Sequence, residues 1–224
     1  MKKYFLITVL LTLVFTLDLP WSSKENIENE PPYLQLNKGD YNILLEESEL
    51  IWIGKKITLK EHSGTLQFKE GTISINDDGI IYGNITIDMT SINNTDMKGK
   101  MKRKLEEHLK NDDFFSVNQF STSKIEFQST IRENNKIQFD GNLTIKGISH
   151  PISFIADIIE SSNQLKAETR LVFDRSIYDV RYRSGTFYEN LGNHLILDNI
   201  SLDILLVAIK DENNFDILQQ RLQQ

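Results

Sequence analysis

Apolar residues occupy every second position in many short segments of this chain, and this alternation constrains the fold more than any other feature. Successive side chains of a β-strand point to opposite faces, so a period of two predicts strands with one buried face. The chain is therefore predicted to be an all-β protein. The clearest alternating residues are Leu66 and Phe68; Ile73 and Ile75; Ile85, Ile87 and Met89; Ile125 and Phe127; Ile137 and Phe139; Leu143 and Ile145; Ile152 and Phe154; Leu171 and Phe173; and Ile200, Leu202, Ile204 and Leu206.

Short turn sequences separate these predicted strands. Such connections join antiparallel neighbours, because parallel strands need long crossovers. An antiparallel sheet with one apolar face either packs on a second sheet or closes on itself, so a sandwich and a barrel both remain open. Gly141 and Gly147 are expected where a strand bends, forms a bulge or lets another backbone approach. The predicted turns are KEGT (69–72), NDDG (76–79), RENNK (132–136) and GISHP (147–151).

One segment, residues 95–115, departs from the period of two. Its apolar residues recur every fourth position, which predicts a single amphipathic helix inserted between strands. Asp96 is expected to cap the start of this helix and Asn111 to end it. A shorter helix is predicted at residues 215–224. The apolar stripe of the inserted helix consists of Met97, Met101, Leu105 and Leu109.

The composition excludes several classes of protein. With 224 residues, 39% of them hydrophobic, the chain is long enough for one domain with a substantial core. A formal net charge of -7 argues against nucleic acid as a partner. The absence of cysteine excludes disulfides, thiolate metal ligands and thiol nucleophiles. The four histidines lack metal-ligand spacing and no Gly-x-Ser-x-Gly motif occurs, so we predict neither a metal site nor an enzyme.

The N-terminal residues differ from the rest of the chain. Lys2 and Lys3 precede an apolar run at residues 4–17, which is typical of an export signal, although a retained N-terminal anchor remains the alternative. The predicted organisation is a signal peptide or N-terminal anchor at 1–20, a polar spacer at 21–40, a barrel domain at 41–209 and a polar tail at 210–224.

Six segments in order resemble the YceI-like family of exported lipid-binding proteins, over about residues 41–207. The long segment before residue 41 and the polar tail are departures from the simplest members. The six segments are SELIWIGKK (48–56), HSGTLQFKEGTI (62–73), GNITIDMTSI (83–92), KLEEHLKNDDFF (104–115), GNLTIKGISHPISF (141–154) and FDRSIYDV (173–180).

The resemblance implies an eight-stranded antiparallel lipocalin-like barrel with one inserted amphipathic helix. Its lumen would hold a long isoprenoid chain, either of a polyprenyl lipid or of a quinone, as a bound ligand rather than a cofactor. It also implies export to the periplasm or cell envelope of a bacterium. Transient contact with a membrane surface is expected, and a homodimer is compatible with the sequence.

Residues of one parity in each strand are the candidate lumen residues. A solid core and a ligand tunnel are both compatible with this parity, because an eight-stranded barrel is either filled by side chains or holds one small ligand. The resemblance favours the tunnel; a structural or interaction barrel of the cell envelope with a filled core is the alternative. The candidates are Trp52, Leu66, Phe68, Ile85, Ile87, Met89, Ile125, Phe127, Phe139, Leu143, Ile145 and Phe154.

Six further residues are candidates for the lid or mouth of the lumen. Methionine adapts to irregular apolar shapes, which suits a lid over a lipid, although ordinary core packing explains the same stripe. The three arginines are expected either to bind a phosphate or quinone head group or to form ion pairs with Asp174 and Asp179. The six are Met97, Met101, Leu105, Arg175, Arg181 and Arg183.

Overall fold

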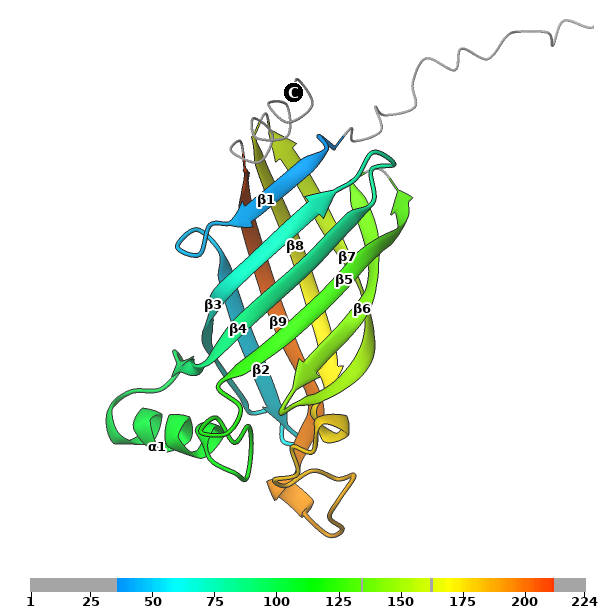
Figure 1. Ribbon diagram of the computed structural model, residues 1–224. Coiled ribbons are helices and arrows are strands. Elements are labelled where there is room, and N and C mark those ends of the chain that lie inside the picture. The colour runs from blue at the N-terminus through cyan, green and yellow to red at the C-terminus, as the bar shows by residue number, and fades with distance from the viewer. Residues whose placement is uncertain (1–35, 134, 162, 212–224) are drawn as a thin grey trace, which may run out of the picture. The chain divides into compact units, whose positions relative to one another are not determined.

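The computed structural model describes residues 36–133, 135–161 and 163–211. Within them, nine strands form one antiparallel sheet in the order β1–β3–β2–β9–β8–β7–β6–β5–β4, and β3 also pairs with β4. This last pairing closes the sheet into a barrel (Figure 1). The strands are β1 (Gly39–Ile43), β2 (Glu49–Lys56), β3 (Glu61–Ile75), β4 (Ile81–Asn94), β5 (Thr122–Glu133), β6 (Lys136–Ile145), β7 (Ile148–Ser161), β8 (Gln164–Asp174) and β9 (Ile196–Lys210).

Strands β1 and β2 occupy a single position in the barrel, because both lie between β3 and β9. The chain leaves the ladder between them at residues 44–48. There the Ser48 hydroxyl donates to the Leu44 carbonyl at 2.8 Å and accepts from the Val207 amide at 3.0 Å, so the backbone of β9 stays paired across the interruption. The predicted eight-stranded antiparallel barrel is therefore confirmed, with its first strand in two pieces.

Two predicted turns are wrong in detail. The KEGT segment lies inside β3, where a register shift against β4 between Phe68 and Glu70 absorbs the irregularity. The turn placed at 147–151 lies instead at Lys146 and Gly147, and Pro151 is inside β7 opposite Asn142. Lys146 and Gly147 both have positive φ, of 51° and 72°, as a two-residue hairpin turn of the right twist requires.

Gly141 fulfils one of the roles predicted for it. A Cβ at this position would overlap the Glu126 carbonyl oxygen and lie 2.8 Å from the Phe127 Cα on the neighbouring strand. Only a residue without a side chain allows this approach of β6 to β5.

The predicted helix forms as α1 (Gly99–Lys110) between β4 and β5, and Asn111 is its C-cap. The prediction that Asp96 caps the helix is wrong, since Lys98 is the N-cap and makes no side-chain cap bond. Asp96 instead accepts hydrogen bonds from His62 Nδ1 at 2.8 Å and from the Ser63 amide at 3.1 Å. The helix predicted at 215–224 and the N-terminal segment through residue 35 lie outside the described residues.

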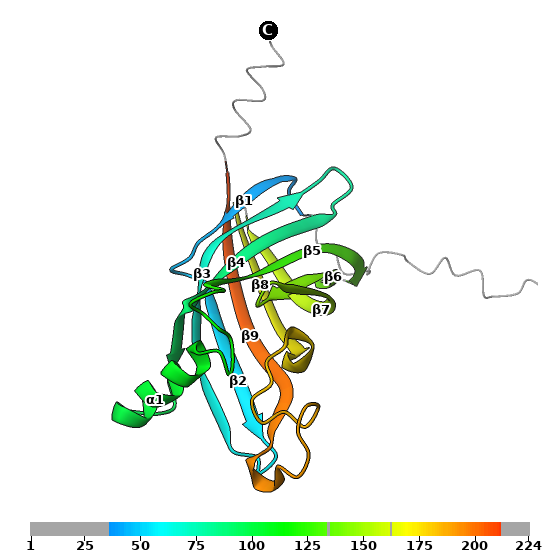
Figure 2. The same ribbon diagram turned by 60° about the horizontal axis from the view of Figure 1, so that its bottom comes forward.

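Short 3-10 helices η1 (Arg175–Tyr178) and η2 (Gly192–His194) lie in the connection from β8 to β9. They lie at the same end of the barrel as α1, which we call the helical end (Figures 1 and 2). No helix in the described part of the chain is long and apolar enough to cross a membrane.

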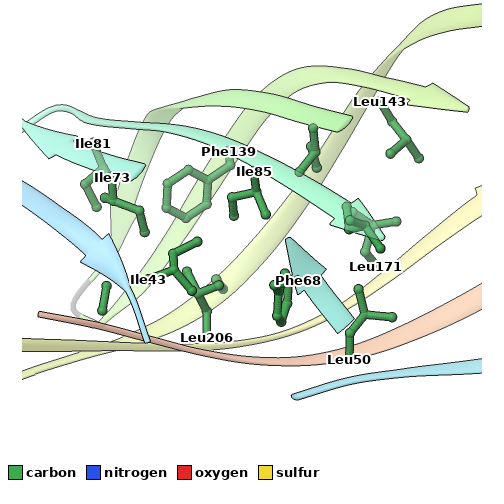
Figure 3. Close-up of a cluster of buried hydrophobic side chains, with 14 of the residues drawn as sticks. Ile43, Leu50, Phe68, Ile73, Ile81, Ile85, Phe139, Leu143, Leu171 and Leu206 are labelled. Atoms are coloured by element: carbon green, nitrogen blue, oxygen red, sulfur yellow. The ribbon is translucent and has the colours of Figure 1, made fainter. Parts of the chain in front are cut away.

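The core lies inside the barrel. Figure 3 shows side chains from the surrounding strands converging on this interior, among them Phe68, Ile85 and Phe139. Within each regular stretch of a strand the inward residues share one parity, as the period of two predicts, and the parity changes where the register shifts, as between Phe68 and Ile73 in β3. The interior is therefore the place where a ligand would be held.

Candidate ligand-binding lumen

Two cavities follow one another along the barrel interior. The outer cavity, at the helical end, has a volume of about 140 Å³, and the inner cavity has a volume of about 70 Å³. Apolar side chains form nearly all of both walls. Four residues line both cavities, and we call them the waist: Leu50, Ile87, Leu143 and Leu202.

All twelve candidate lumen residues line one or both cavities, so the parity argument placed each of them on the inner face. Their contact with a ligand stays a prediction. The outer cavity alone is lined by Trp52, Leu66, Met89 and Ile145, the inner cavity alone by Phe68, Ile85, Ile125, Phe127, Phe139 and Phe154, and both by Ile87 and Leu143.

Aromatic rings concentrate in the inner cavity. Phe139 and Phe154 stack with centroids 5.3 Å apart, and Phe127 meets their edges at 5.2 and 5.5 Å. Such contacts rigidify a wall beyond the effect of area burial alone. The inner cavity thus offers a firm, wholly apolar surface to a hydrocarbon chain.

Several lining residues were missed as candidates although the sequence held a signal for them. Leu171 and Phe173 in β8 and Leu202 in β9 belong to alternating segments that the sequence already identified. Leu50 shares the parity of Trp52, and Ser123 shares the parity of Ile125. A rule that took every inward position, polar ones included, would have found them.

Only part of the predicted lid lies at the lumen. Leu105 lines the outer cavity, together with Leu109 of the same helix. Met97 is half-buried and lines neither cavity, and Met101 is 61% exposed and also lines neither. The stripe is split because only its two leucines, in the second half of α1, line the outer cavity.

Arg175 is the most buried charged residue at the helical end and lines the outer cavity. Its guanidinium donates to the carbonyls of Val180 at 2.9 Å, Ile196 at 3.1 Å and Leu197 at 3.3 Å. Nη2 also lies 3.1 Å from Asp198 Oδ1. The donors are therefore engaged within the protein, which favours the ion-pair alternative over head-group binding.

The close ion-pair partner of Arg175 differs from the neighbour that the sequence suggested. Asp174 accepts a hydrogen bond from the Ser176 amide at 2.8 Å and so caps η1. Burial lowers the pKa of Arg175, while the charges of Asp198 and Asp174 oppose this shift. Arg175 nevertheless stays charged, because an arginine guanidinium does not deprotonate in proteins.

Arg181 and Arg183 do not reach the lumen. Both line a polar pocket on the outside of the helical end, of about 400 Å³, which Asp112 and Asp113 also line. Arg181 pairs with Asp179, as predicted, and its guanidinium lies 5.0 Å from the Phe187 ring centroid. Neither residue lines either cavity, and a role for them in head-group binding at the mouth stays a prediction.

The outer cavity reaches the surface near the turn between β2 and β3. Lys55 and Lys60 line it there and are solvent-exposed, so we call this opening the mouth. Between them, Ile57 is half exposed and Leu59 is 84% exposed. An apolar tip with flanking lysines therefore borders the mouth.

His62 lines the outer cavity close to the mouth and pairs with Asp96 at 2.8 Å. Burial alone would raise the pKa of Asp96. The hydrogen bonds from His62, the Ser63 amide and Asn94, together with the charge of His62, outweigh burial and lower this pKa below its ordinary value of 3.8. The pair ties β3 to the segment that leads into α1.

Comparisons with known proteins agree with this architecture. The model of the YceI-like domain matches residues 41–208. The structure of BcnA from Burkholderia cenocepacia has 18% sequence identity and a TM-score of 0.58, and the match covers 74% of this chain and 98% of that one. A search of curated proteins gives no match.

A polyisoprenoid binding domain from Saccharophagus degradans, implicated in plant cell wall breakdown, is similarly related in structure. It has 15% identity and a TM-score of 0.57, with 76% of this chain and 98% of that chain covered. At such identities the two structures establish the shared fold alone. Because the domain match spans more than half of the chain, the chain belongs to the YceI-like family.

Proposed function

We propose that the protein binds, and thereby transports or stores, an amphiphile with a long isoprenoid chain in the barrel lumen. The observation that carries this proposal is the pair of apolar cavities in line along the barrel. Burial of a hydrocarbon chain gains about 0.8 kcal/mol per methylene before ordering costs, so a few isoprene units suffice for tight binding. The polyisoprenoid-binding domain with the same fold supports this ligand class.

The walls of the two cavities favour binding without catalysis. No aspartate or glutamate of the described residues lines either cavity, and His62, their one histidine, is paired with Asp96. General acid–base chemistry needs a titratable group within hydrogen-bond reach of the reacting atoms. The lysines that line the outer cavity, Lys55, Lys56 and Lys60, lie at its mouth, and the rest of the lumen offers mainly hydrophobic contact.

The waist favours a second candidate, a structural barrel with a filled core. Leu50, Ile87, Leu143 and Leu202 lie between the two cavities. A long chain must move these side chains to occupy both cavities. Leucine and isoleucine side chains change rotamer at low cost, so the waist is compatible with a chain that threads it.

The mouth supports delivery at a membrane surface. Leu59 and Ile57 form an exposed apolar tip, and Lys55, Lys56 and Lys60 lie beside it. Anionic phospholipid attracts the lysines, while the two apolar side chains insert among the acyl chains. We propose that this tip contacts an anionic membrane while the ligand enters or leaves the outer cavity.

Export to a bacterial envelope completes the proposal. Its support is the pair Lys2 and Lys3 followed by the apolar run at 4–17, which lies outside the described residues. An isoprenoid carrier in that compartment would meet lipid surfaces directly.

Native mass spectrometry of the protein purified gently from its own host tests the binding function. We expect a stoichiometric hydrophobic adduct that solvent extraction removes and that the extracted compound restores. A protein without any adduct that also refuses isoprenoid quinones and polyprenyl phosphates would support the filled barrel instead.

A further inference from the structure

The barrel wall is interrupted between β7 and β8 toward the helical end. The ladder between these two strands ends at Ala156 and Thr169. Beyond that level β7 stays paired with β6, and β8 stays paired with β9, over the rest of their lengths. Residues 148–155 of β7 and 170–174 of β8 therefore lie beyond the end of their shared ladder, and we call the stretch between them the seam.

Local sequence explains why this ladder stops. The Ile155 carbonyl accepts a hydrogen bond from the Thr169 hydroxyl at 2.7 Å, so a side chain supplies a donor where the ladder ends. The backbone groups of successive strand residues point to alternate neighbours, so Ser153 and Pro151 face β8, as Ile155 does. Proline has no backbone N–H and is found in sheets essentially only at edges and bulges. Pro151 thus makes this side of β7 an edge.

A second break in the wall is covered differently. The ladder between β4 and β5 ends at Asp88, well before the end of β4. There α1 lies against β4, and Lys110 Nζ donates to the Thr90 carbonyl at 2.7 Å. At the seam, His150 Nε2 donates to the Ile177 carbonyl of η1 at 3.0 Å. A long helix therefore covers one break, whereas a four-residue helix closes one end of the other.

Apolar side chains flank the seam on both surfaces of the barrel wall. On the outside, Ile155 of β7 is 58% exposed, Val172 of β8 is 49% exposed and Ile177 of η1 is 44% exposed. On the inside, Phe154 and Leu171 line the inner cavity. Exposed apolar groups that gather at one place commonly mark a site of interaction. A hydrocarbon chain that crosses the wall here would keep apolar contact from the surface to the inner cavity.

We propose that the seam is a side portal through which the hydrocarbon chain of the ligand enters and leaves the inner cavity. The two strands part for this step, and the bond from His150 to η1 otherwise holds the seam closed. The chain then moves sideways into the lumen and does not have to pass the waist end-on. Free strand edges also suit an extended peptide, but a peptide has no need of the apolar path to a cavity. This inference rests on the proposed function and adds the route of the chain.

Cross-linking across the seam tests the portal, because the chain has no cysteine of its own. Ser153→Cys with Val172→Cys places two exposed thiols on opposite sides of the seam, and a flexible bismaleimide joins them. We expect the cross-link to slow both uptake and release of an eight-unit polyprenol at least about tenfold and to change its affinity less than about twofold, because the barrier rises for both directions. Native mass spectrometry of the delipidated full chain over time measures the rates. The matched control is Asp157→Cys with Glu168→Cys, direct partners within the ladder, whose cross-link should change neither rate.

Amide hydrogen exchange of the ligand-free full chain examines the seam without a ligand. The amides of Ile155 and Val172 face the seam, whereas those of Phe154 and Leu171 face β6 and β9. We expect the first two amides to exchange at least about a hundredfold faster than the other two. Equal protection of all four would mean that β7 and β8 are paired along the seam and would overturn the inference.

His150→Ala removes the bond to η1 and should speed uptake and release about fivefold, as the loss of one hydrogen bond predicts. Unchanged rates in this variant would overturn the role of His150 in closing the seam.

The remaining outcomes separate the portal from the proposed function. Unchanged rates in the cross-linked seam variant would overturn the portal and leave the binding function standing. A co-purified peptide that the seam cross-link displaces would replace the hydrocarbon chain as the occupant. Failure of the polyprenol to bind before cross-linking would overturn the binding function itself.

Discussion

The indole ring of Trp52 on β2 lies against the backbone of Gly64 on β3, its direct partner in the ladder. A Cβ at Gly64 would lie 2.6 Å from Trp52 Cζ2 and 2.8 Å from Cε2, and it would overlap the Asn93 carbonyl oxygen. The absence of a side chain at Gly64 therefore sets the position of Trp52 in the wall of the outer cavity.

Gly64→Ala should displace Trp52 and destabilise the barrel. Overpacking of this kind costs about 1–3 kcal/mol, which urea unfolding would measure. The matched control is Gly54→Ala, because a Cβ there would meet Ile200 Cδ1 at an ordinary 3.6 Å. Equal stability of the two variants would contradict the close packing of Trp52 on Gly64.

Leu143→Phe should obstruct the waist, since Leu143 lines both cavities. We expect it to weaken binding of an eight-unit polyprenol at least about tenfold, because the chain loses its methylene contacts in the inner cavity. Binding of geraniol, with two units, should change much less. Leu66→Phe, confined to the outer cavity, is the control, and native mass spectrometry with both alcohols provides the measurement. An equal effect of Leu143→Phe on both alcohols would argue against threading.

Arg175→Met should destabilise the protein by about 3–5 kcal/mol, because it leaves Asp198 without its close partner and three carbonyls without a donor. The double variant Arg175→Met with Asp198→Asn should recover part of this loss. Chemical denaturation of the set would measure both effects. If Arg175→Met kept full stability but lost affinity for ligand, Arg175 would be a head-group residue after all.

Asp96→Asn should change how stability depends on pH. The pKa of Asp96 is lowered in the fold, so its carboxylate stabilises the protein fully above its ordinary value of 3.8 and loses that contribution as the pH falls through the folded value. The variant should be less stable at pH 7 and should lose less stability than the parent protein as the pH falls below 3.8. Urea unfolding of the parent protein and the variant at a series of pH values would measure this difference in stability. Asp112→Asn, which removes an exposed carboxylate outside this pair, is the matched control.

Leu59→Asp should reduce binding to vesicles that contain phosphatidylglycerol. The change removes the most exposed apolar residue of the tip and adds a charge that anionic lipid repels. Flotation with phosphatidylcholine vesicles, with and without phosphatidylglycerol, measures the effect. Ile131→Asp is the control, because Ile131 is exposed in β5 near the opposite end of the barrel. Similar flotation of the two variants would argue against the tip as the contact surface.

The sequence by itself determined the strands, their inward faces and the inserted helix. These depend on local periodicity, since side-chain direction in a strand or helix follows from the position of a residue within that element. For this reason Phe127 and Leu143 could be placed on the inner face without any knowledge of strand order. Ser123 has the same parity as Ile125, but it was not among the candidate lumen residues because those were chosen for their hydrophobic side chains.

Only the tertiary structure decided which distant residues meet. Arg175 pairs with Asp198 rather than Asp174, and Asp96 pairs with His62 rather than capping α1. These partners lie far apart in the sequence and meet only when the strands pair and the barrel closes, which the pattern within one segment does not show. The division of the lumen at Leu143 arises in the same way, because the width of a cavity depends on side chains that several strands contribute to one level of the barrel.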